Sequence, residues 1–216
     1  MIKQSLFASL AVLFLTACSL KMPEFSDILS FSSSNNYEEL LKEANTCQDI
    51  EKDNEKLVCY KKIENINSFA QIRLGTYYLE QKDFDRTIKY LNKAKDSGNL
   101  YANLPIALLY YRGEAIKKDI NKSFELLNEA SNIDPVAAFQ LSKFYTQGIN
   151  TQVDIEKGLG LLEFAAQKDV RDAQEVLSNI YKQGLFDVAK DQVKFEYWQN
   201  RAKKNLNDRN LKIYIL

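Results

Sequence analysis

The chain has 216 residues, 45% of them hydrophobic, and its 29 basic and 29 acidic residues give a formal net charge of 0. This balance lacks the basic excess of a nucleic-acid-binding protein, so nucleic acid is not expected as a partner. The chain contains no histidine, which excludes histidine-dependent catalytic triads and histidine metal ligands.

Residues 1–17 are predicted to be a cleaved targeting segment. Lys3 supplies a positive charge and Leu6–Leu15 a short apolar run, which is shorter than the roughly 20 residues of a membrane-spanning helix but typical of a signal peptide. The following Leu15-Thr16-Ala17-Cys18 resembles the lipobox of bacterial lipoproteins. That resemblance implies cleavage before Cys18, a covalent lipid on its thiol and a membrane anchor, and Ser19 favours the outer membrane, facing the periplasm. The alternative is an ordinary secretory signal with a chance cysteine after it.

Residues 18–36 are rich in serine and asparagine, and they are predicted to form a flexible tether between the lipid and the folded domain. Residues 37–67 contain two helical patterns around a polar turn and are expected to form a hairpin that caps the start of the domain. This hairpin contains Cys47 and Cys59, the pair that remains once Cys18 is lipidated. A cysteine pair in an exported chain predicts a disulfide, with two reduced, buried thiols as the alternative.

An internal repeat organises residues 68–205. Alanines recur at intervals of 36 residues: Ala94, Ala130, Ala166 and Ala202. In the segment before each alanine, an apolar residue precedes a tyrosine by four positions, which places both on one helix face; the tyrosines are Tyr78, Tyr110, Tyr145 and Tyr181. They are assigned to packing rather than to binding. A glycine follows the last three tyrosines and is expected to cap its helix in the left-handed conformation; these are Gly113, Gly148 and Gly184. The pattern predicts an all-α fold, a right-handed α-solenoid of four stacked antiparallel helix pairs.

The third unit carries the clearest family resemblance. Leu141-Ser142-Lys143-Phe144-Tyr145-Thr146-Gln147-Gly148 and the later Phe164-Ala165-Ala166 resemble a Sel-one-like repeat (SLR), a relative of the tetratricopeptide repeat (TPR). The resemblance covers roughly residues 68–205, although Gln81 replaces the glycine in the first unit. It implies a non-enzymatic scaffold in envelope assembly, secretion or polysaccharide export, with unidentified envelope proteins as partners. Two alternatives stay open: a peptidoglycan- or β-lactam-type ligand, and contact with host proteins at the cell surface.

No catalytic or cofactor site is evident in the sequence. Gly158 and Gly160 lack the strand and the lysine–serine pair of a phosphate-binding loop, so close packing between units is the preferred explanation for them. No metal is expected, and no cofactor beyond the lipid on Cys18.

The candidate partner-binding residues follow the apolar anchor of each first helix by two positions, on the expected concave face: Thr76, Leu108, Lys143 and Asn179. They differ in chemistry, as a partner surface would, although an ordinary solvated helix face is the alternative. The C-terminal segment, residues 206–216, ends in the apolar run Leu211–Leu216. This run is expected to fold back on the last helix as a cap, with a recognition tail for a partner as the alternative.

Overall fold

The computed structural model describes residues 25–205, 208 and 210–215, so the predicted signal segment and Cys18 lie outside it. The chain divides into two units, Met1–Asn35 and Asn36–Leu216, and the second contains all of the repeat helices. Helix α1 (Phe25–Gln48) begins in the first unit. The flexible tether predicted for residues 18–36 is therefore wrong from Phe25 onward, because no proline or glycine between Phe25 and Gln48 breaks the helix.

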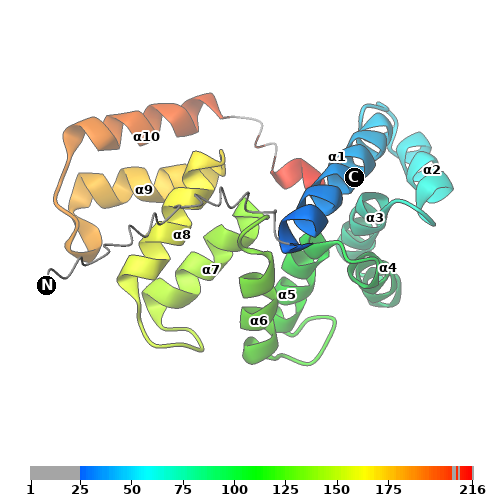
Figure 1. The fold of residues 1–216 in the computed structure, drawn as a ribbon, viewed down its shortest axis with the longest axis horizontal. Coiled ribbons are helices and arrows are strands. Elements are labelled where there is room, and N and C mark those ends of the chain that lie inside the picture. The colour runs from blue at the N-terminus through cyan, green and yellow to red at the C-terminus, as the bar shows by residue number, and fades with distance from the viewer. Residues whose placement is uncertain (1–24, 206–207, 209, 216) are drawn as a thin grey trace, which may run out of the picture. The chain divides into compact units, whose positions relative to one another are not determined.

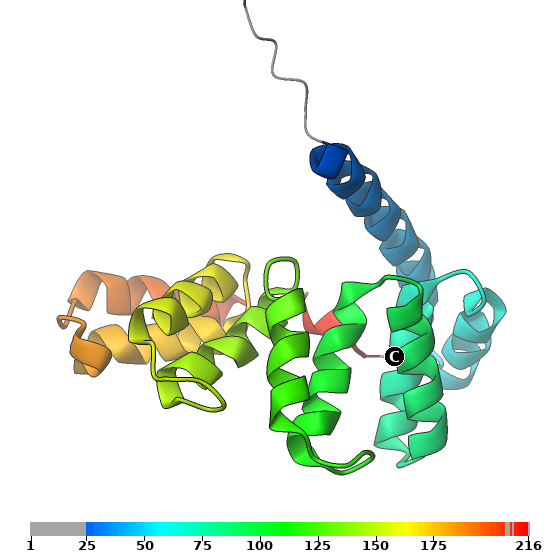
Figure 2. The same cartoon turned by 60° about the horizontal axis from the view of Figure 1, so that its bottom comes forward.

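Four antiparallel helix pairs follow one another along the second unit (Figures 1 and 2). They are α3 (Ser68–Glu80) with α4 (Phe84–Asp96), α5 (Asn103–Arg112) with α6 (Ile120–Ala130), α7 (Pro135–Gln147) with α8 (Ile155–Gln167), and α9 (Arg171–Gln183) with α10 (Gln192–Lys204). Short 3₁₀ turns lie at Leu100–Ala102 (η1), Leu185–Asp187 (η2) and Leu211–Ile213 (η3). No strand occurs among the described residues, and the predicted all-α solenoid is confirmed.

Glycine ends the first helix of the last three pairs, as predicted. Gly113, Gly148 and Gly184 have φ values of 73°, 66° and 74°, a left-handed conformation that glycine adopts without a steric penalty. In the first pair the capping residue Gln81 has a φ of −80°, and the left-handed conformation moves to Lys82, with a φ of 56°. The first turn is therefore built differently because it has no glycine.

An aspartate begins the second helix of every pair, where its side chain accepts a hydrogen bond from a backbone N–H three residues later: Asp83, Asp119, Asp154 and Asp191. Such N-caps satisfy backbone donors that the helix itself leaves free. In three pairs the basic side chain at that third position lies over the repeat tyrosine, at 4.3, 4.3 and 4.8 Å from the ring centre. These three repeat tyrosines thus contribute to packing between the paired helices.

The predicted N-terminal hairpin is present. The end of α1 and helix α2 (Asp53–Ile63) are joined by a disulfide between Cys47 and Cys59, whose Cα atoms lie 5.5 Å apart. Asn67, the N-cap of α3, donates to the backbone carbonyl of Leu40 at 2.8 Å. This bond fastens the hairpin to the first repeat, where a capping element is needed.

The two glycines of α8 differ in their surroundings. A Cβ added at Gly158 would lie 2.5 Å from the side-chain methyl carbon of Thr146 in α7, whereas one at Gly160 would meet nothing within 4 Å. The close-packing interpretation is therefore confirmed for Gly158, within one helix pair rather than between units. It is wrong for Gly160, which faces open space.

The C-terminal segment was expected to fold back on the last helix. In the structure it reaches the earlier repeats as well. The side chain of Asp208 accepts from the backbone N–H of Arg171 at 2.9 Å, and the chain then crosses the array until the carbonyl of Lys212 accepts from Arg73 of α3 at 3.1 Å. The expectation is wrong because the earlier repeats offer this segment an apolar groove and two buried polar partners. We call residues Leu211–Ile215 the tail.

Candidate partner-binding face

The first helices of three successive pairs form an apolar groove with a volume of about 230 Å³, which we call the groove. Its walls come from α3, α5 and α7, and the tail closes it: Thr76, Leu79, Leu104, Pro105, Leu108, Leu109, Arg112, Val136 and Gln140, with Leu211 and Tyr214 of the tail. Figures 1 and 2 place η3 of the tail beside these helices. The tail therefore forms one wall of the face expected to bind a partner, and the volume beside it is open.

Arg73 anchors one end of the tail. Its guanidinium is fully buried and donates to the hydroxyl of Tyr60 at 3.0 Å, to the side-chain oxygen of Asn45 at 2.7 Å and to the carbonyl of Lys212 at 3.1 Å. Burial lowers the pKa of Arg73, and its Nε atom has no hydrogen-bond partner. A buried cation depends on such acceptors, so the tail carbonyl helps to stabilise it.

Asp134 anchors the other end. It is fully buried at the N-cap of α7, where its carboxylate accepts from the N–H of Val136 at 2.9 Å and from the hydroxyl of Tyr214. Burial raises the pKa of Asp134 to about 6, and the two hydrogen bonds oppose this rise. Burial also raises the pKa of Tyr214 well above its ordinary value, so the tyrosine stays a proton donor. The tail is thus joined to the repeats by one backbone and one side-chain hydrogen bond.

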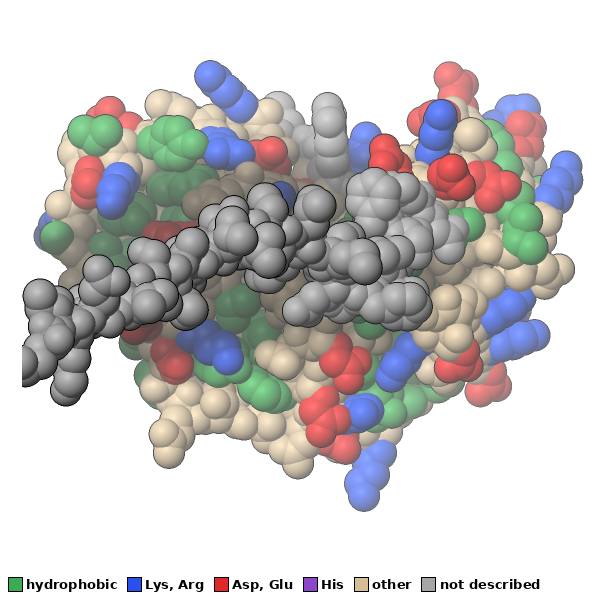
Figure 3. Space-filling model, in the orientation of Figure 1, with side chains coloured by type: hydrophobic (Ala, Val, Ile, Leu, Met, Phe, Trp, Pro, Cys, Tyr) green, Lys and Arg blue, Asp and Glu red, His purple; other side chains and the backbone are tan. Residues whose placement is uncertain are grey.

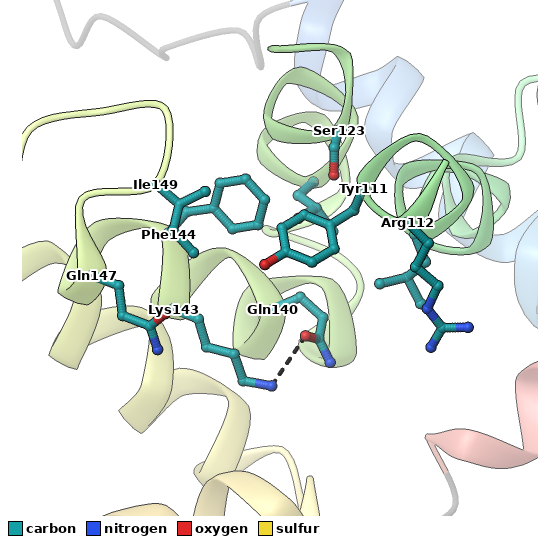
Figure 4. A pocket seen from close by; sticks show the side chains of 10 residues that line it. Tyr111, Arg112, Ser123, Gln140, Lys143, Phe144, Gln147 and Ile149 are labelled. Carbon is teal, nitrogen blue, oxygen red and sulfur yellow. Dashed lines mark hydrogen bonds between the residues drawn. The ribbon is translucent and has the colours of Figure 1, made fainter. Parts of the chain in front are cut away.

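A second hollow of about 240 Å³ lies between α5, α6 and α7, and we call it the side cavity (Figure 4). It shares Leu108, Arg112 and Gln140 with the groove. Figure 4 shows Lys143 reaching toward Gln140, to which it donates a hydrogen bond of 3.1 Å. The two hollows are therefore neighbours on either side of these shared side chains.

The four candidate residues from the sequence fall unequally on this surface. Thr76 and Leu108 line the groove, and Leu108 and Lys143 line the side cavity. Asn179 lies exposed on α9, where it accepts from Gln183 at 2.7 Å, and it lines neither hollow. The structure thus brings three of the four together.

Sequence reasoning missed the two anchors. Arg73 interrupts the apolar stretch Phe69–Leu74, and a charged residue in such a stretch is a signal for a buried polar contact. Asp134 precedes Pro135, a pairing typical of a helix start. That signal predicts a cap, but it gives no sign that the carboxylate is buried.

The part of the chain that the structure describes shows neither a metal-binding cluster nor a membrane-spanning helix. It contains no cluster of three or more cysteine or acidic side chains arranged to hold a metal ion. Over residues 25–205, 208 and 210–215, no helix combines the length and apolar character needed to cross a bilayer. On the face visible in Figure 3, acidic and basic side chains of the described residues are intermingled.

Stacked helix pairs with capped first helices define an α-solenoid of the tetratricopeptide-like class, whose members present extended binding surfaces. The family model described as Sel1 repeat matches residues 68–99, 101–133 and 135–170. Residues 68–170 therefore contain three Sel1 repeats, and the fourth helix pair continues the array beyond the matched residues.

Comparison with known proteins agrees with this family. The chain is 29% identical over 105 residues to the alginate biosynthesis protein AlgK of Pseudomonas syringae pv. tomato, covering 49% of this chain but only 22% of AlgK. A Sel1 repeat protein from Oxalobacter formigenes superposes with a TM-score of 0.65 at 25% identity, covering 68% of this chain and 61% of that one. The uropathogenic Escherichia coli protective antigen c5321, which has an SLR fold, superposes with a TM-score of 0.58 at 21% identity, over 74% and 36% of the two chains.

Proposed function

We propose that this chain is a non-enzymatic adaptor whose groove binds an extended segment of a partner protein. One observation carries the proposal: a peptide segment, the chain's own tail, already lies against the helices that form the groove. The tail contributes a buried apolar side chain, Ile213, a backbone carbonyl to Arg73 and a hydroxyl to Asp134. A segment from another protein that offers the same three groups can make the same contacts.

The tail is only partly buried, so another segment could displace it. Ile213 is buried, but Leu211 and Ile215 remain 46% and 45% exposed, and the repeats supply two buried polar groups, Arg73 and Asp134. The hydrogen bond from Arg73 to a backbone carbonyl does not depend on the side chain of the bound residue. The groove and Asp134 would therefore determine which segments bind. A partner segment bound in this way would displace the tail, because both use the same donors and acceptors.

We further propose that the adaptor works in the bacterial cell envelope, held by a lipid on Cys18 at the outer membrane and facing the periplasm. The lipobox-like sequence supports the anchor, and the disulfide between Cys47 and Cys59 suits an oxidising compartment outside the cytoplasm. The similarity to an alginate biosynthesis protein supports a role beside envelope assembly or polysaccharide export. Its partners would be proteins of that machinery.

The proposal is tested with the full chain and a variant whose tail is released, Ile213→Ser combined with Tyr214→Ser. A fluorescent peptide carrying residues 208–216 is titrated into both and followed by anisotropy. We expect the release variant to bind it about tenfold or more tightly than the unaltered chain, because an occupied groove lowers apparent affinity by the fraction that is free. A correctly folded release variant that binds the peptide no better than the unaltered chain would overturn the proposal.

A further inference from the structure

The side cavity holds a buried polar group without a partner. Ser123 is fully buried in α6, and its hydroxyl has no hydrogen-bond partner; Figure 4 shows it directed toward the cavity. The equivalent residue of the first repeat, Thr87, donates to the carbonyl of Asp83 at 2.8 Å. An unsatisfied buried hydroxyl lowers the stability of the empty protein, so a ligand that accepts its hydrogen bond would recover that loss.

The side cavity also carries positive charge without a balancing acid. Arg112 and Lys143 both line it, and no aspartate or glutamate does. Neither cation forms an ion pair within the described part of the chain. Burial lowers the pKa of Lys143, and Asp172 of α9, which opposes this, does not line the cavity. An added carboxylate would therefore meet two cations that form no ion pair among the described residues.

The remaining walls suit a short apolar stem. The rings of Tyr111 and Phe144 lie 5.7 Å apart, and Leu127 adds an aliphatic side. A volume of about 240 Å³ lies below that of typical drug-sized sites, so the cavity fits one side chain rather than a large ligand. No described residue of the tail lines it.

We infer that the side cavity receives an acidic side chain, glutamate or aspartate, from the partner segment that occupies the groove. Lys143 and Arg112 neutralise its carboxylate, Ser123 donates a hydrogen bond to it, and Tyr111 and Phe144 pack against its stem. The inference rests on the proposed function, because the acidic side chain arrives on a segment bound in the groove. It adds a second requirement to that segment: an acidic residue beside the apolar and hydroxyl-bearing ones.

The first test uses the full-length release variant and a peptide series. Each position of the 208–216 peptide is replaced in turn by glutamate and, as the uncharged match, by glutamine. At one position or more, we expect the glutamate peptide to bind about tenfold more tightly than its glutamine match, which corresponds to about 1.4 kcal/mol. Lys143→Gln added to the release variant should remove this preference, whereas Lys182→Gln, an exposed lysine on α9, should preserve it.

The second test uses Ser123→Ala, whose two effects should have opposite signs. Without peptide, the variant should unfold at a higher temperature, because it loses an unsatisfied buried hydroxyl. With the preferred glutamate peptide, its affinity should fall several-fold. A variant that gains stability but keeps full affinity would overturn the role of Ser123.

The outcomes separate the two proposals. If the unmodified peptide binds but no glutamate exceeds its glutamine match, the acidic subsite is wrong and the groove proposal stands. If no peptide binds, the groove proposal fails first. If N-acetylglutamate methylamide alone binds as tightly as the best peptide, the ligand is a free small carboxylate, and the assignment to a partner segment is overturned.

Discussion

The hydroxyl of Tyr214 donates a hydrogen bond to the carboxylate of Asp134, 80 residues earlier in the chain. The bond ties the C-terminal segment to the start of the third helix pair, while the bond from Arg73 to the carbonyl of Lys212 ties it to the first. The end of the chain therefore fastens repeats that would otherwise contact only their neighbours. A partner that displaces the tail has to replace both bonds.

Tyr214→Phe tests the first of these bonds. Removal of the hydroxyl leaves a buried carboxylate with one donor fewer, which should lower the free energy of unfolding by about 1–3 kcal/mol in urea denaturation at pH 7. Tyr197→Phe is the matched control, because Tyr197 is 53% exposed although its hydroxyl accepts from Arg201 at 2.9 Å. The control should change stability by less than about 0.5 kcal/mol. Equal effects would show that the Asp134 contact adds nothing.

Asp134 should make stability depend on pH between about 4 and 7. Its pKa is about 6 in the folded chain, against 3.8 for an ordinary aspartate, so the folded state binds more protons in this window and stability falls as the pH rises. Tyr101 and Tyr214 face the carboxyl, and both stay protonated there because burial raises their pKa values.

Asp134→Asn isolates this effect, because asparagine keeps a helix cap and an acceptor. Relative to the unaltered chain, the variant should gain stability from pH 4 to pH 7 by up to about 3 kcal/mol, since one pKa unit is worth about 1.4 kcal/mol. Urea denaturation of both proteins across this range measures the difference. A difference that does not change with pH would contradict the raised pKa.

The two glycines of α8 form a matched pair for packing. Gly158→Ala should destabilise the chain by about 1–3 kcal/mol, because its methyl group would collide with Thr146 and force α7 and α8 apart. Gly160→Ala should stabilise it by up to about 1 kcal/mol, because alanine is the better helix former and meets nothing there. Thermal unfolding of both variants checks the contrast, and the same sign for both would contradict the geometry.

Cys18→Ser tests the proposed lipid anchor. The variant should keep the helical circular dichroism of the unaltered chain but move from the membrane fraction to the soluble fraction after cell lysis, because the anchoring acyl chains are lost. Metabolic labelling with a fatty-acid analogue should mark the unaltered chain and not the variant. A variant that stays in the membrane fraction at its processed size would contradict lipidation at this cysteine.

The repeats could be predicted from the sequence because each sequence signal acts locally. Gly113, Gly148 and Gly184 end helices through their own backbone conformations. Three of the repeat tyrosines contact a basic side chain from the second helix of their own pair: Tyr78, Tyr145 and Tyr181. Periodicity therefore predicted the helix pairs, whereas the disulfide of the capping hairpin was predicted from the cysteine pair of an exported chain. Three of the four candidate binding residues, Thr76, Leu108 and Lys143, followed from the same register.

The tail and its anchors could not be predicted, because their contacts have no period. Tyr214 meets Asp134 and Lys212 meets Arg73 at separations of 80 and 139 residues, so no repeat relates them. The apolar character of Leu211–Leu216 predicts burial but not the place of burial. Ser123 occupies a regular repeat position, and only the packing around it reveals that its hydroxyl lacks a partner.

The most direct test of the adaptor function is photo-crosslinking in living cells that produce the chain. A benzoylphenylalanine at Leu79, in the groove, is compared with one at Val193, which is 78% exposed on α10, in the unaltered and tail-released chains. We expect a discrete adduct with a partner peptide from position 79 only, and more of it when the tail is released. Equal adducts from both positions, or loss of the adduct on tail release, would contradict the central claim that a partner segment takes the place of the tail.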